Sequence, residues 1–456
     1  MNCKNDNGGT RIDMEELRQE IWEMPILDSH EHIGSIPSTG GAAGIPGFNE
    51  DVYPGFEPGP TTIFDLILSP YLGGLLNSLG FKMPMTHTRD TAGQQEQLWK
   101  ALIPFLNKAR GTGLYMALDK AFDGLYGASL GDILNGSRDW KALSRAVEYN
   151  YQRGLYKWSG EIFKRLKIQY AIKPVHLPYI GAMGKQDNND SYILEQNLFL
   201  PVFRVDDLLG YPDQASICGW KHLTGLMDIE VHEIRDLDDM VSKAFIMLKE
   251  NNIRAIKQLQ AYTRPLRFKK VERDRAASAL KRTLGNGDPM SKIEVQDYIM
   301  GLILERANKT KLPFQVHSGM ANLPDSNPVL LRDSIERYPE VNFILLHCYP
   351  YLSEAAFLAR SYRNVYLDTA WLALQSPALL YKALDEWIGF VPYSKICLSG
   401  DATSVEECYG AMEMTREALS CVLHNKIRKG ELDRELAFMI ARSLLHDNAA
   451  ALYAAG

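Results

Sequence analysis

The chain has 456 residues, of which 46% are hydrophobic and 23% are charged, and its formal net charge is −6. This composition is ordinary for a globular protein, and the length fits one barrel domain of about 250–400 residues plus an insertion. A net negative charge gives no general attraction to nucleic acid or anionic lipid, so we expect neither as a partner. We also expect no membrane span, because no apolar run approaches the roughly 18 residues that crossing a bilayer requires.

The six cysteines are widely spaced and contain no CxxC pair. A disulfide framework is denser than this, so the pattern indicates reduced thiols in a cytoplasmic protein. The N-terminal segment is polar and does not resemble a signal peptide. Soluble enzymes commonly form homo-oligomers, and that base rate is the only guide to the oligomeric state.

Eight short apolar runs recur along the chain, and helical patterns separate the later ones. The runs are 25–28, 170–172, 200–203, 253–256, 313–316, 342–346, 365–367 and 396–398; the helical patterns are 236–251, 327–337 and 353–362. Short continuous apolar runs are typical of parallel strands buried on both faces. Alternation of strands and helices predicts an α/β fold. Eight units favour a (β/α)8 TIM barrel, with residues 1–456 as a single domain.

The segment between the first two predicted strands, residues 35–167, does not fit this repeat. Its early part is rich in Gly and Pro, which predicts a long loop, and the remainder from Thr61 looks helical. It follows the carboxyl end of the first strand, where barrel enzymes keep their active sites. We therefore predict an inserted cap subdomain that acts as a lid or substrate-binding wall, with a dimer interface as the alternative.

The strongest local signal is the pair His30 and His32 at the end of the first predicted strand. Alternate side chains of a strand share a face, so the two imidazoles project together and Glu31 points away. Two imidazoles on one face are good ligands for Zn²⁺ or a similar divalent ion. An isolated HxH pattern, however, is common by chance.

Three further polar residues stand at the ends of predicted strands. His317 and His347 each follow an apolar run directly, and Asp401 comes just after the last strand. The carboxyl ends of all strands meet at one rim of a barrel, so these side chains and the HxH pair would converge. One such position could be a buried histidine or a helix cap, but several at the same strand ends predict a site.

The ordered set of HxH, His, His and a final Asp resembles the amidohydrolase superfamily. The C-terminal third is similar to nodulin-type amidohydrolase-2 domains, some of which are fused to a glutamine-synthetase-like module. The stretches that carry this similarity are 256–266, 347–350 (HCYP), 365–368 (VYLD), 399–401 (SGD), 407–411 (ECYGA) and 447–453 (DNAAALY). The long segment after the first strand is the main departure from the pattern.

The resemblance implies a barrel hydrolase in which a divalent metal activates water. By position, His30, His32 and His317 match the metal ligands. Asp401 matches the aspartate that touches the metal and shuttles a proton, and His347 matches the sixth-strand histidine. We expect Zn²⁺, with Mn²⁺ or Fe²⁺ as alternatives, and one ion rather than two. With one ion, His347 is better used to orient water or to stabilise an oxyanion.

Lys257, at the end of the fourth predicted strand, bears on the number of metal ions. Some superfamily members carry a lysine here whose carbamate bridges two metals, whereas an unmodified ammonium has no acceptor for a cation. A carbamate, a substrate-binding ammonium and an ordinary lysine that reaches the surface all remain open.

Four more residues are candidates for substrate binding. The Arg264 guanidinium suits a substrate carboxylate, although solvated loop arginines are common. Tyr262 could donate a hydrogen bond to an oxyanion or simply pack. Asp368 and Trp371 follow the seventh strand and could line the pocket.

Three functions fit these residues. The first is hydrolysis of an amide C–N bond, or of a lactone or ester, in a small, polar substrate that we expect to carry a carboxylate. The second keeps the metal site but decarboxylates its substrate or isomerises a uronate. The third is a catalytically inactive binding module, which the complete set of expected ligands disfavours.

Overall fold

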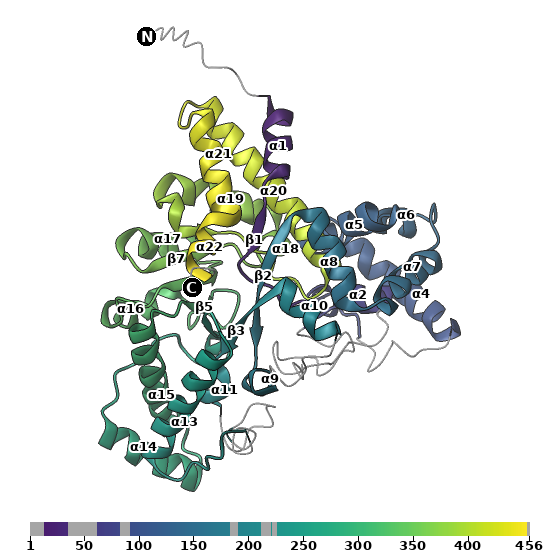
Figure 1. The fold of residues 1–456 in the computed structure, drawn as a ribbon. Coiled ribbons are helices and arrows are strands. Elements are labelled where there is room, and N and C mark those ends of the chain that lie inside the picture. The colour runs from purple at the N-terminus through teal and green to yellow at the C-terminus, as the bar shows by residue number, and fades with distance from the viewer. Residues whose placement is uncertain are drawn as a thin grey trace.

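The computed structural model of the chain describes residues 13–34, 62–82, 92–182, 190–210, 220 and 226–453 (Figure 1). At its centre lies an eight-stranded parallel sheet in which every strand pairs with the next one along the chain. The strands are β1 (Ile26–Asp28), β2 (Ile168–Val175), β3 (Phe199–Arg204), β4 (Ile256–Gln258), β5 (Phe314–Ser318), β6 (Phe343–His347), β7 (Val365–Asp368) and β8 (Ile396–Cys397). The predicted α/β architecture with eight parallel strands is confirmed.

The fourth strand begins later than predicted. The apolar run 253–256 only leads into β4, whose pairing with β3 joins Phe203 to Ile256 and Arg204 to Lys257. The chain joins the sheet only at the end of the predicted run, where the Ala255 carbonyl accepts from the Phe203 amide at 3.0 Å. Lys257 is therefore the middle residue of β4, and it does not follow the strand as predicted.

The sheet curls so that the ends of its first and last strands meet. The Asp401 amide donates to the His30 carbonyl at 2.9 Å, and the His32 amide donates to the Ala402 carbonyl at 2.9 Å. The Ser29 amide completes the contact at 3.4 Å from the Leu398 carbonyl. Segments nearly 370 residues apart in the chain thus run side by side at one end of the sheet.

Helices precede each of the later strands, as the α/β pattern predicts. They are α13 (Ile234–Glu250), α14 (Arg273–Asn286), α15 (Pro289–Thr310), η2 (Pro328–Leu331), α16 (Arg332–Arg337), α17 (Leu352–Ser361), α18 (Leu372–Gln375), α19 (Pro377–Phe390) and η3 (Tyr393–Lys395). The predicted helix 327–337 is a 3-10 turn followed by a short α-helix. The predicted helices 236–251 and 353–362 coincide with α13 and α17 to within two residues.

The remaining elements lie at the chain ends and after the early strands. They are α1 (Met14–Glu23), α9 (Leu177–Ala182), α10 (Asp190–Leu198), α11 (Asp206–Leu209), η1 (Gln260–Tyr262), α20 (Val405–Arg428), α21 (Arg434–Arg442), the π-helical turn η4 (Ser443–Asp447) and α22 (Asn448–Tyr453). None of the helices in the described ranges combines the length and hydropathy needed to cross a bilayer.

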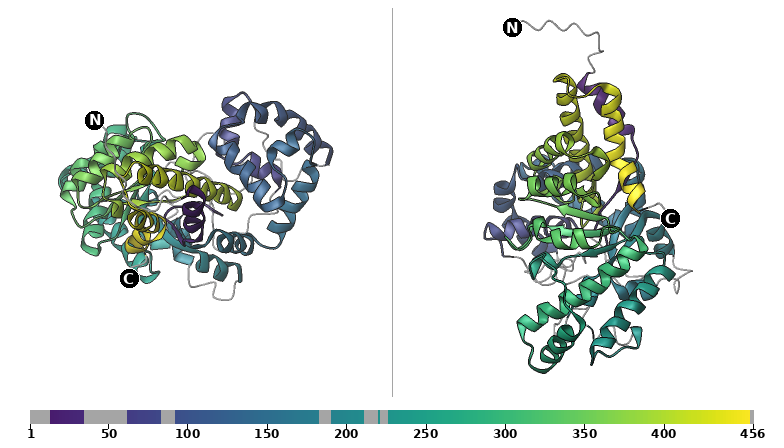
Figure 2. Two further views of the ribbon diagram at one scale, coloured as in Figure 1. Left: turned by 90° about the horizontal axis from the view of Figure 1, so that it is seen from above. Right: turned by 90° about the vertical axis from the view of Figure 1, so that its left-hand side faces the viewer.

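Helices also fill the described part of the chain between β1 and β2. They are α2 (Ile63–Ile67), α3 (Leu72–Ser78), α4 (Ala92–Ala109), α5 (Gly113–Tyr126), α6 (Leu130–Leu134), α7 (Trp140–Gln152) and α8 (Leu155–Leu166). Figure 2 shows that α4–α7 project to one side of the sheet. The predicted Gly- and Pro-rich loop lies outside the described residues. That these helices form a cap subdomain of their own stays a prediction.

Helix α20 contacts several of these helices through buried side chains and backbone. The buried carboxylate of Glu406 accepts hydrogen bonds from Tyr126 Oη at 2.6 Å, Tyr151 Oη at 2.6 Å and Trp158 Nε1 at 3.0 Å, which come from α5, α7 and α8. One turn further along α20, Gly410 has no room for a side chain, since a Cβ there would lie 2.0 Å from the Ala117 carbonyl oxygen of α5. Backbone-to-helix contact this close requires glycine.

This contact predicts that Gly410→Ala destabilises the protein. Adding one methyl group to a filled interface costs about 1–3 kcal/mol, and the close backbone here places the loss at the upper end of that range. Gly285→Ala is the matched control, because Gly285 also lies in a helix but has open space around its Cα. Chemical denaturation should show a large loss for Gly410→Ala and a neutral or stabilising effect for Gly285→Ala. Equal stabilities would contradict the tight α5–α20 contact.

Candidate metal centre

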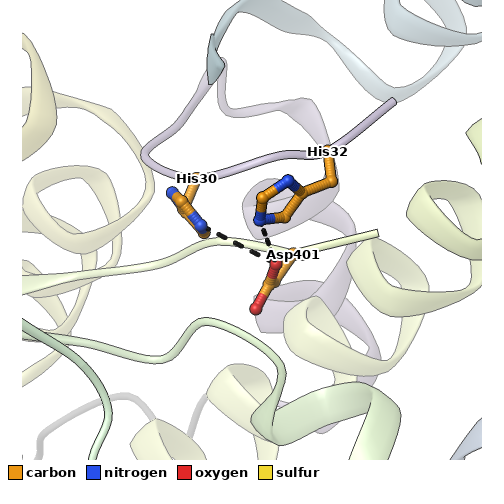
Figure 3. Close-up of side chains that lie close together, drawn as sticks. All are labelled: His30, His32 and Asp401. Atoms are coloured by element: carbon orange, nitrogen blue, oxygen red, sulfur yellow. Dashed lines mark ion pairs between the residues drawn. The ribbon is translucent and has the colours of Figure 1, made fainter. Parts of the chain in front are cut away.

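Three buried side chains converge where the first and last strands meet. His30 and His32 follow β1, and Asp401 follows β8 (Figure 3). Asp401 Oδ1 lies 3.8 Å from His30 Nε2 and 3.5 Å from His32 Nε2, and one ligand atom from each residue falls within 4.8 Å of the others. We call these three residues the metal cluster. Glu31, between the two histidines, contacts Ala402 N and lies near Asp28 and Cys408 instead.

His347 and His317 form a second pair of imidazoles beside this cluster. His347 Nδ1 lies 3.0 Å from the Ala370 carbonyl oxygen and 3.3 Å from Asp401 Oδ2. Its Nε2 lies 3.0 Å from His317 Nδ1. His317 is thus joined to the metal cluster through His347 and is not one of the three grouped residues. Direct binding of the same ion by His317 therefore stays a prediction.

Lys257 enters the metal cluster from β4. Its Nζ lies 2.6 Å from His30 Nε2 and 3.4 Å from His32 Nε2, and its side chain is fully buried. The alternative in which this lysine reaches the protein surface is therefore wrong. An ammonium at this position would compete with a cation for the two imidazole lone pairs. A neutral or modified Lys257 would not.

Burial sets the charge state of the cluster. It lowers the pKa of His30 and His32 well below the usual value, and the nearby Lys257 adds to the effect. Burial also lowers the pKa of His347 to about 3. The imidazoles are therefore neutral at physiological pH, which is the form that binds metal. Burial raises the pKa of Asp401, although Lys257 opposes this shift, and burial lowers the pKa of Lys257.

The backbone at the strand ends is unusual. His347, Cys348, Trp371 and Asp401 all have positive φ values, between 56° and 66°. Residues other than glycine rarely adopt this left-handed conformation, and such positions concentrate at functional sites. The turns direct the side chains of His347 and Asp401 toward each other. Burial raises the pKa of the Cys348 thiol to about 12, so it is not a reactive thiolate.

Gln315 orients His30, and sequence reasoning missed it. The Gln315 amide nitrogen donates to the Ser29 carbonyl at 2.8 Å and lies 2.9 Å from Tyr453 Oη. Its amide oxygen therefore faces His30 Nδ1, 3.0 Å away, so that Nδ1 carries the proton. The lone pair of His30 is then on Nε2, toward Asp401. Gln315 shares a strand face with His317, and that alternation was the signal available in the sequence.

Tyr71 is the second residue that was missed. It lies between α2 and α3, and its hydroxyl donates to Asp401 Oδ1 at 3.4 Å. Its ring packs on Trp371, with 4.8 Å between centroids, and Trp371 in turn lies 5.8 Å from the His347 ring. Trp371 thus lies between Tyr71 and His347, and its role in lining a substrate pocket stays a prediction. Nothing in the local sequence around Tyr71 marks it.

Tyr262 also lies near the imidazoles. Its ring centroid is 4.6 Å from that of His317, and burial raises its pKa.

Farther along the sheet, Arg204 at the end of β3 lies 3.2 Å from His176 Nε2, whose Nδ1 contacts Asp207 at 2.7 Å. Both partners of His176, which follows β2, come from the end of the neighbouring strand β3 and the turn after it.

Arg264 and Asp368 lie in places that do not suit their predicted roles. Arg264 pairs with Asp297 at 2.5 Å, packs on Phe268 and is only 4% exposed. Its guanidinium thus holds α15 against the loop after β4, and we leave it out of the proposed site. Asp368 is fully buried, and its two oxygens accept from Ser29, Ser399 Oγ and the Ala370 amide. These contacts leave no exposed oxygen for a substrate.

A second buried group lies behind the metal cluster. Glu31 Oε2 accepts from the Ala402 amide at 2.6 Å, and Asp28 Oδ1 accepts from the amides of His30 at 3.1 Å and Gly400 at 3.3 Å. Burial and mutual repulsion raise the pKa of Glu31, and burial raises that of Asp28. A Cβ at Gly400 would meet Glu31 Oε1 at 2.3 Å. These carboxyl groups tie the two ligand-bearing segments together.

A divalent cation fits the metal cluster. Four ligands around zinc at 2.0–2.2 Å lie about 3.3 Å from one another, and the nitrogen–oxygen separations of 3.5 and 3.8 Å are close to this value. The donor set of neutral imidazoles and one carboxylate is typical of zinc, iron and manganese sites. The cluster is also buried, which strengthens the attraction between a cation and a carboxylate.

Comparison with known proteins finds a family model that matches the C-terminal third of the chain. The family model for amidohydrolases matches residues 297–455. The protein fluG of Emericella nidulans is 33% identical over 172 residues, which are 36% of this chain and 20% of the fluG protein. The chain therefore matches only about a fifth of that relative's length.

Solved structures resemble the whole chain at low sequence identity. A glucuronate isomerase from Caulobacter crescentus superposes with a TM-score of 0.72 at 14% identity, covering 99% of this chain and 95% of that one. A protein from Lactobacillus casei, provisionally named a metal-dependent hydrolase, gives a TM-score of 0.60 at 17% identity, covering 96% of this chain and 97% of that one. At such identities the similarity establishes the fold alone.

The contact between Gln315 and His30 predicts a role for Gln315 in metal affinity. Replacing Gln315 with Leu removes the acceptor that keeps the His30 Nδ1 proton in place, and loss of such a contact typically weakens metal binding about 10- to 100-fold. Zinc titration against a chromophoric chelator measures this. Gln315→Glu, which retains an acceptor oxygen, should bind zinc more tightly than Gln315→Leu. Unchanged affinity in Gln315→Leu would show that His30 needs no such partner.

Proposed function

We propose that this chain is a metal-dependent hydrolase, because residues 297–455 match the family model for amidohydrolases. The bond it breaks is an amide C–N bond, or a lactone or ester bond, in a small polar substrate that carries a carboxylate. The observation that carries this proposal is the buried convergence of His30, His32 and Asp401. Such a donor set is the minimum that a hydrolytic metal site requires.

We propose one divalent ion, with zinc first and manganese or iron as alternatives. When bound, the ion would polarise the carbonyl group of the substrate and lower the pKa of water from 15.7 to about 7. His30 and His32 would hold it through Nε2, and Asp401 through a carboxylate oxygen. A second ion would need a carbamate on Lys257. Lys257 Nζ lies 2.6 Å from His30 Nε2, which leaves little room for a carbamate group unless the lysine side chain shifts.

The chain's own residues divide the proton transfers. Asp401 is within reach of both the metal cluster and His347, so its carboxylate can take a proton from water and pass it to the leaving group. The His347 imidazole is neutral and can orient the water or donate to a developing oxyanion. Tyr71 supplies a further O–H donor at Asp401. Lys257, if unmodified, would be a neutral amine beside the ion and could donate a hydrogen bond to the substrate carboxylate.

A cap over the site is part of the proposal. Helices α2–α8 would form it, within a single domain that spans residues 1–456. Tyr71 supports this, because it belongs to the described part of that segment and contacts Asp401 directly. A lid that excludes water strengthens electrostatic interactions inside an active site.

A second candidate is isomerisation of a uronate at the same site. The specific observation in its favour is the fit of the whole chain to a glucuronate isomerase, including the helices between β1 and β2, at a TM-score of 0.72. In that reaction Asp401 and Tyr71 would move protons between adjacent carbons of the sugar. A metal-dependent decarboxylase is the remaining alternative.

Assay of the zinc-loaded protein against N-acyl amino acids, lactones and uronates tests these candidates. We expect turnover in the first two classes, zinc near one ion per chain, and loss of at least about 100-fold in kcat for Asp401→Asn. Asp274→Asn, on the exposed first turn of α14, is the matched control and should keep full activity. Turnover of uronates alone would favour the isomerase. Binding without turnover in any class would favour an inactive module.

Zinc affinity should rise with pH. Burial raises the pKa of Asp401 and lowers that of Lys257, so metal binding must remove a proton from Asp401 and find Lys257 uncharged. Both conditions are met better as the pH increases from about 6 to 9. Calorimetry in two buffers of different ionisation enthalpy should detect the released protons. An affinity that stays constant over this range would contradict the assignment of Asp401 as a ligand that must ionise.

A further inference from the structure

Glu407, in the first turn of α20, has contacts that the proposed chemistry does not use. It begins the ECYGA stretch, its side chain is 2% exposed, and both of its oxygens accept hydrogen bonds. Oε1 accepts from Ser69 Oγ at 2.6 Å. Oε2 accepts from the Thr403 amide at 2.9 Å and from Thr403 Oγ1 at 2.7 Å.

The two partners of Glu407 flank the contact between Tyr71 and Asp401. Ser69 is two residues before Tyr71, and Thr403 is two residues after Asp401. One carboxylate thus holds both segments whose side chains meet 3.4 Å apart at the metal cluster. The segment that carries Tyr71 comes from between β1 and β2, whereas Thr403 follows β8. The Glu407 carboxylate is a direct polar bridge between them.

The turn that Glu407 holds has little freedom to adjust. Ser69 Oγ also accepts from the Leu72 amide at 3.3 Å, and the Ser69 carbonyl accepts from the Gly73 amide at 2.8 Å. A Cβ on Gly73 would lie 2.9 Å from the Leu68 carbonyl oxygen, so the backbone folds tightly on itself here. Displacement of Ser69 therefore displaces Tyr71, because the two are joined through a compact hydrogen-bonded turn.

We propose that Glu407 is a positioning residue that places the Tyr71 hydroxyl against Asp401 by bridging Ser69 and Thr403. The proposal rests on the proposed function, in which Asp401 is the reacting carboxylate. In this proposal the reactivity of Asp401 depends on two parts of the chain, the segment after β8 and the turn between α2 and α3. Glu407 itself touches neither substrate nor metal.

Glu406 is a matched control for Glu407. It occupies the same turn of α20, is also buried and accepts three hydrogen bonds. Its partners, Tyr126, Tyr151 and Trp158, are in α5, α7 and α8 and include neither Ser69 nor Thr403. A purely structural role in anchoring the helices would make Glu406→Gln and Glu407→Gln alike. If Glu407 is a positioning residue, only Glu407→Gln should change the α2–α3 turn and the metal site.

Hydrogen exchange of the metal-free protein gives the first test. Ser69→Ala and Glu407→Gln should speed exchange of the amides in residues 69–78 by about tenfold, the effect expected for loss of a hydrogen bond to a charged group. Glu406→Gln should leave this segment unchanged and affect α5 and α7 instead. Unchanged exchange at 69–78 in both Ser69→Ala and Glu407→Gln would overturn the proposal. So would an equal increase in Glu406→Gln.

Cobalt gives the second test, because Co²⁺ binds nitrogen and oxygen ligands and its visible spectrum reports on them. Tyr71→Phe, Ser69→Ala and Glu407→Gln should perturb the spectrum in the same way, and Glu406→Gln should not. In the Tyr71→Phe background, Glu407→Gln should reduce kcat by less than about twofold further, since the two act through one contact. Independent, additive losses would overturn the proposal. If no substrate is turned over, the proposed function fails, but exchange and the cobalt spectrum still decide this one.

Discussion

The backbone hydrogen bonds between residues 29–32 and residues 398–402 are the contact on which the rest of the site depends. They bring the end of β1 beside the end of β8, and only this pairing brings His30 and His32 to Asp401. The curled eight-stranded sheet brings its first and last strands together. Because the pairing is between backbone groups, it holds the ligand side chains without using any of their polar atoms.

The same region concentrates buried ionisable groups. Burial of a carboxylate is unfavourable unless hydrogen bonds or opposite charge stabilise it. Here Asp28, Glu31 and Asp368 accept backbone and hydroxyl donors, and Asp401 lies close to Lys257 and three imidazoles. The carboxyl groups of Asp28 and Glu31 hold the backbone that carries the metal cluster, whereas the Asp401 carboxyl group belongs to the cluster itself. A divalent cation bound by the metal cluster would balance the charge of Asp401.

The sequence predicted the strands and the ligand-bearing strand ends well, for a physical reason. Buried parallel strands are short apolar runs, and His30, His32, His347 and Asp401 all lie shortly after the end of such a run. Residues that act from other elements were beyond this reasoning. Tyr71 reaches the site from a turn between short helices, and its position depends on packing across the whole chain. Arg264 was misread because a loop arginine looks the same whether it faces a pocket or a buried aspartate.

The left-handed backbone at His347, Trp371 and Asp401 has a consequence for how such a chain can change over time. Side chains other than glycine, asparagine and aspartate are strained in this conformation by roughly 1–2 kcal/mol per residue, so the strain falls on His347 and Trp371. A lineage selected only for heat tolerance would gain by exchanging these positions for glycine or asparagine, and it would lose its reactive side chains in doing so. The left-handed turn at His347 therefore sets the stability of the fold against the chemistry proposed for this site.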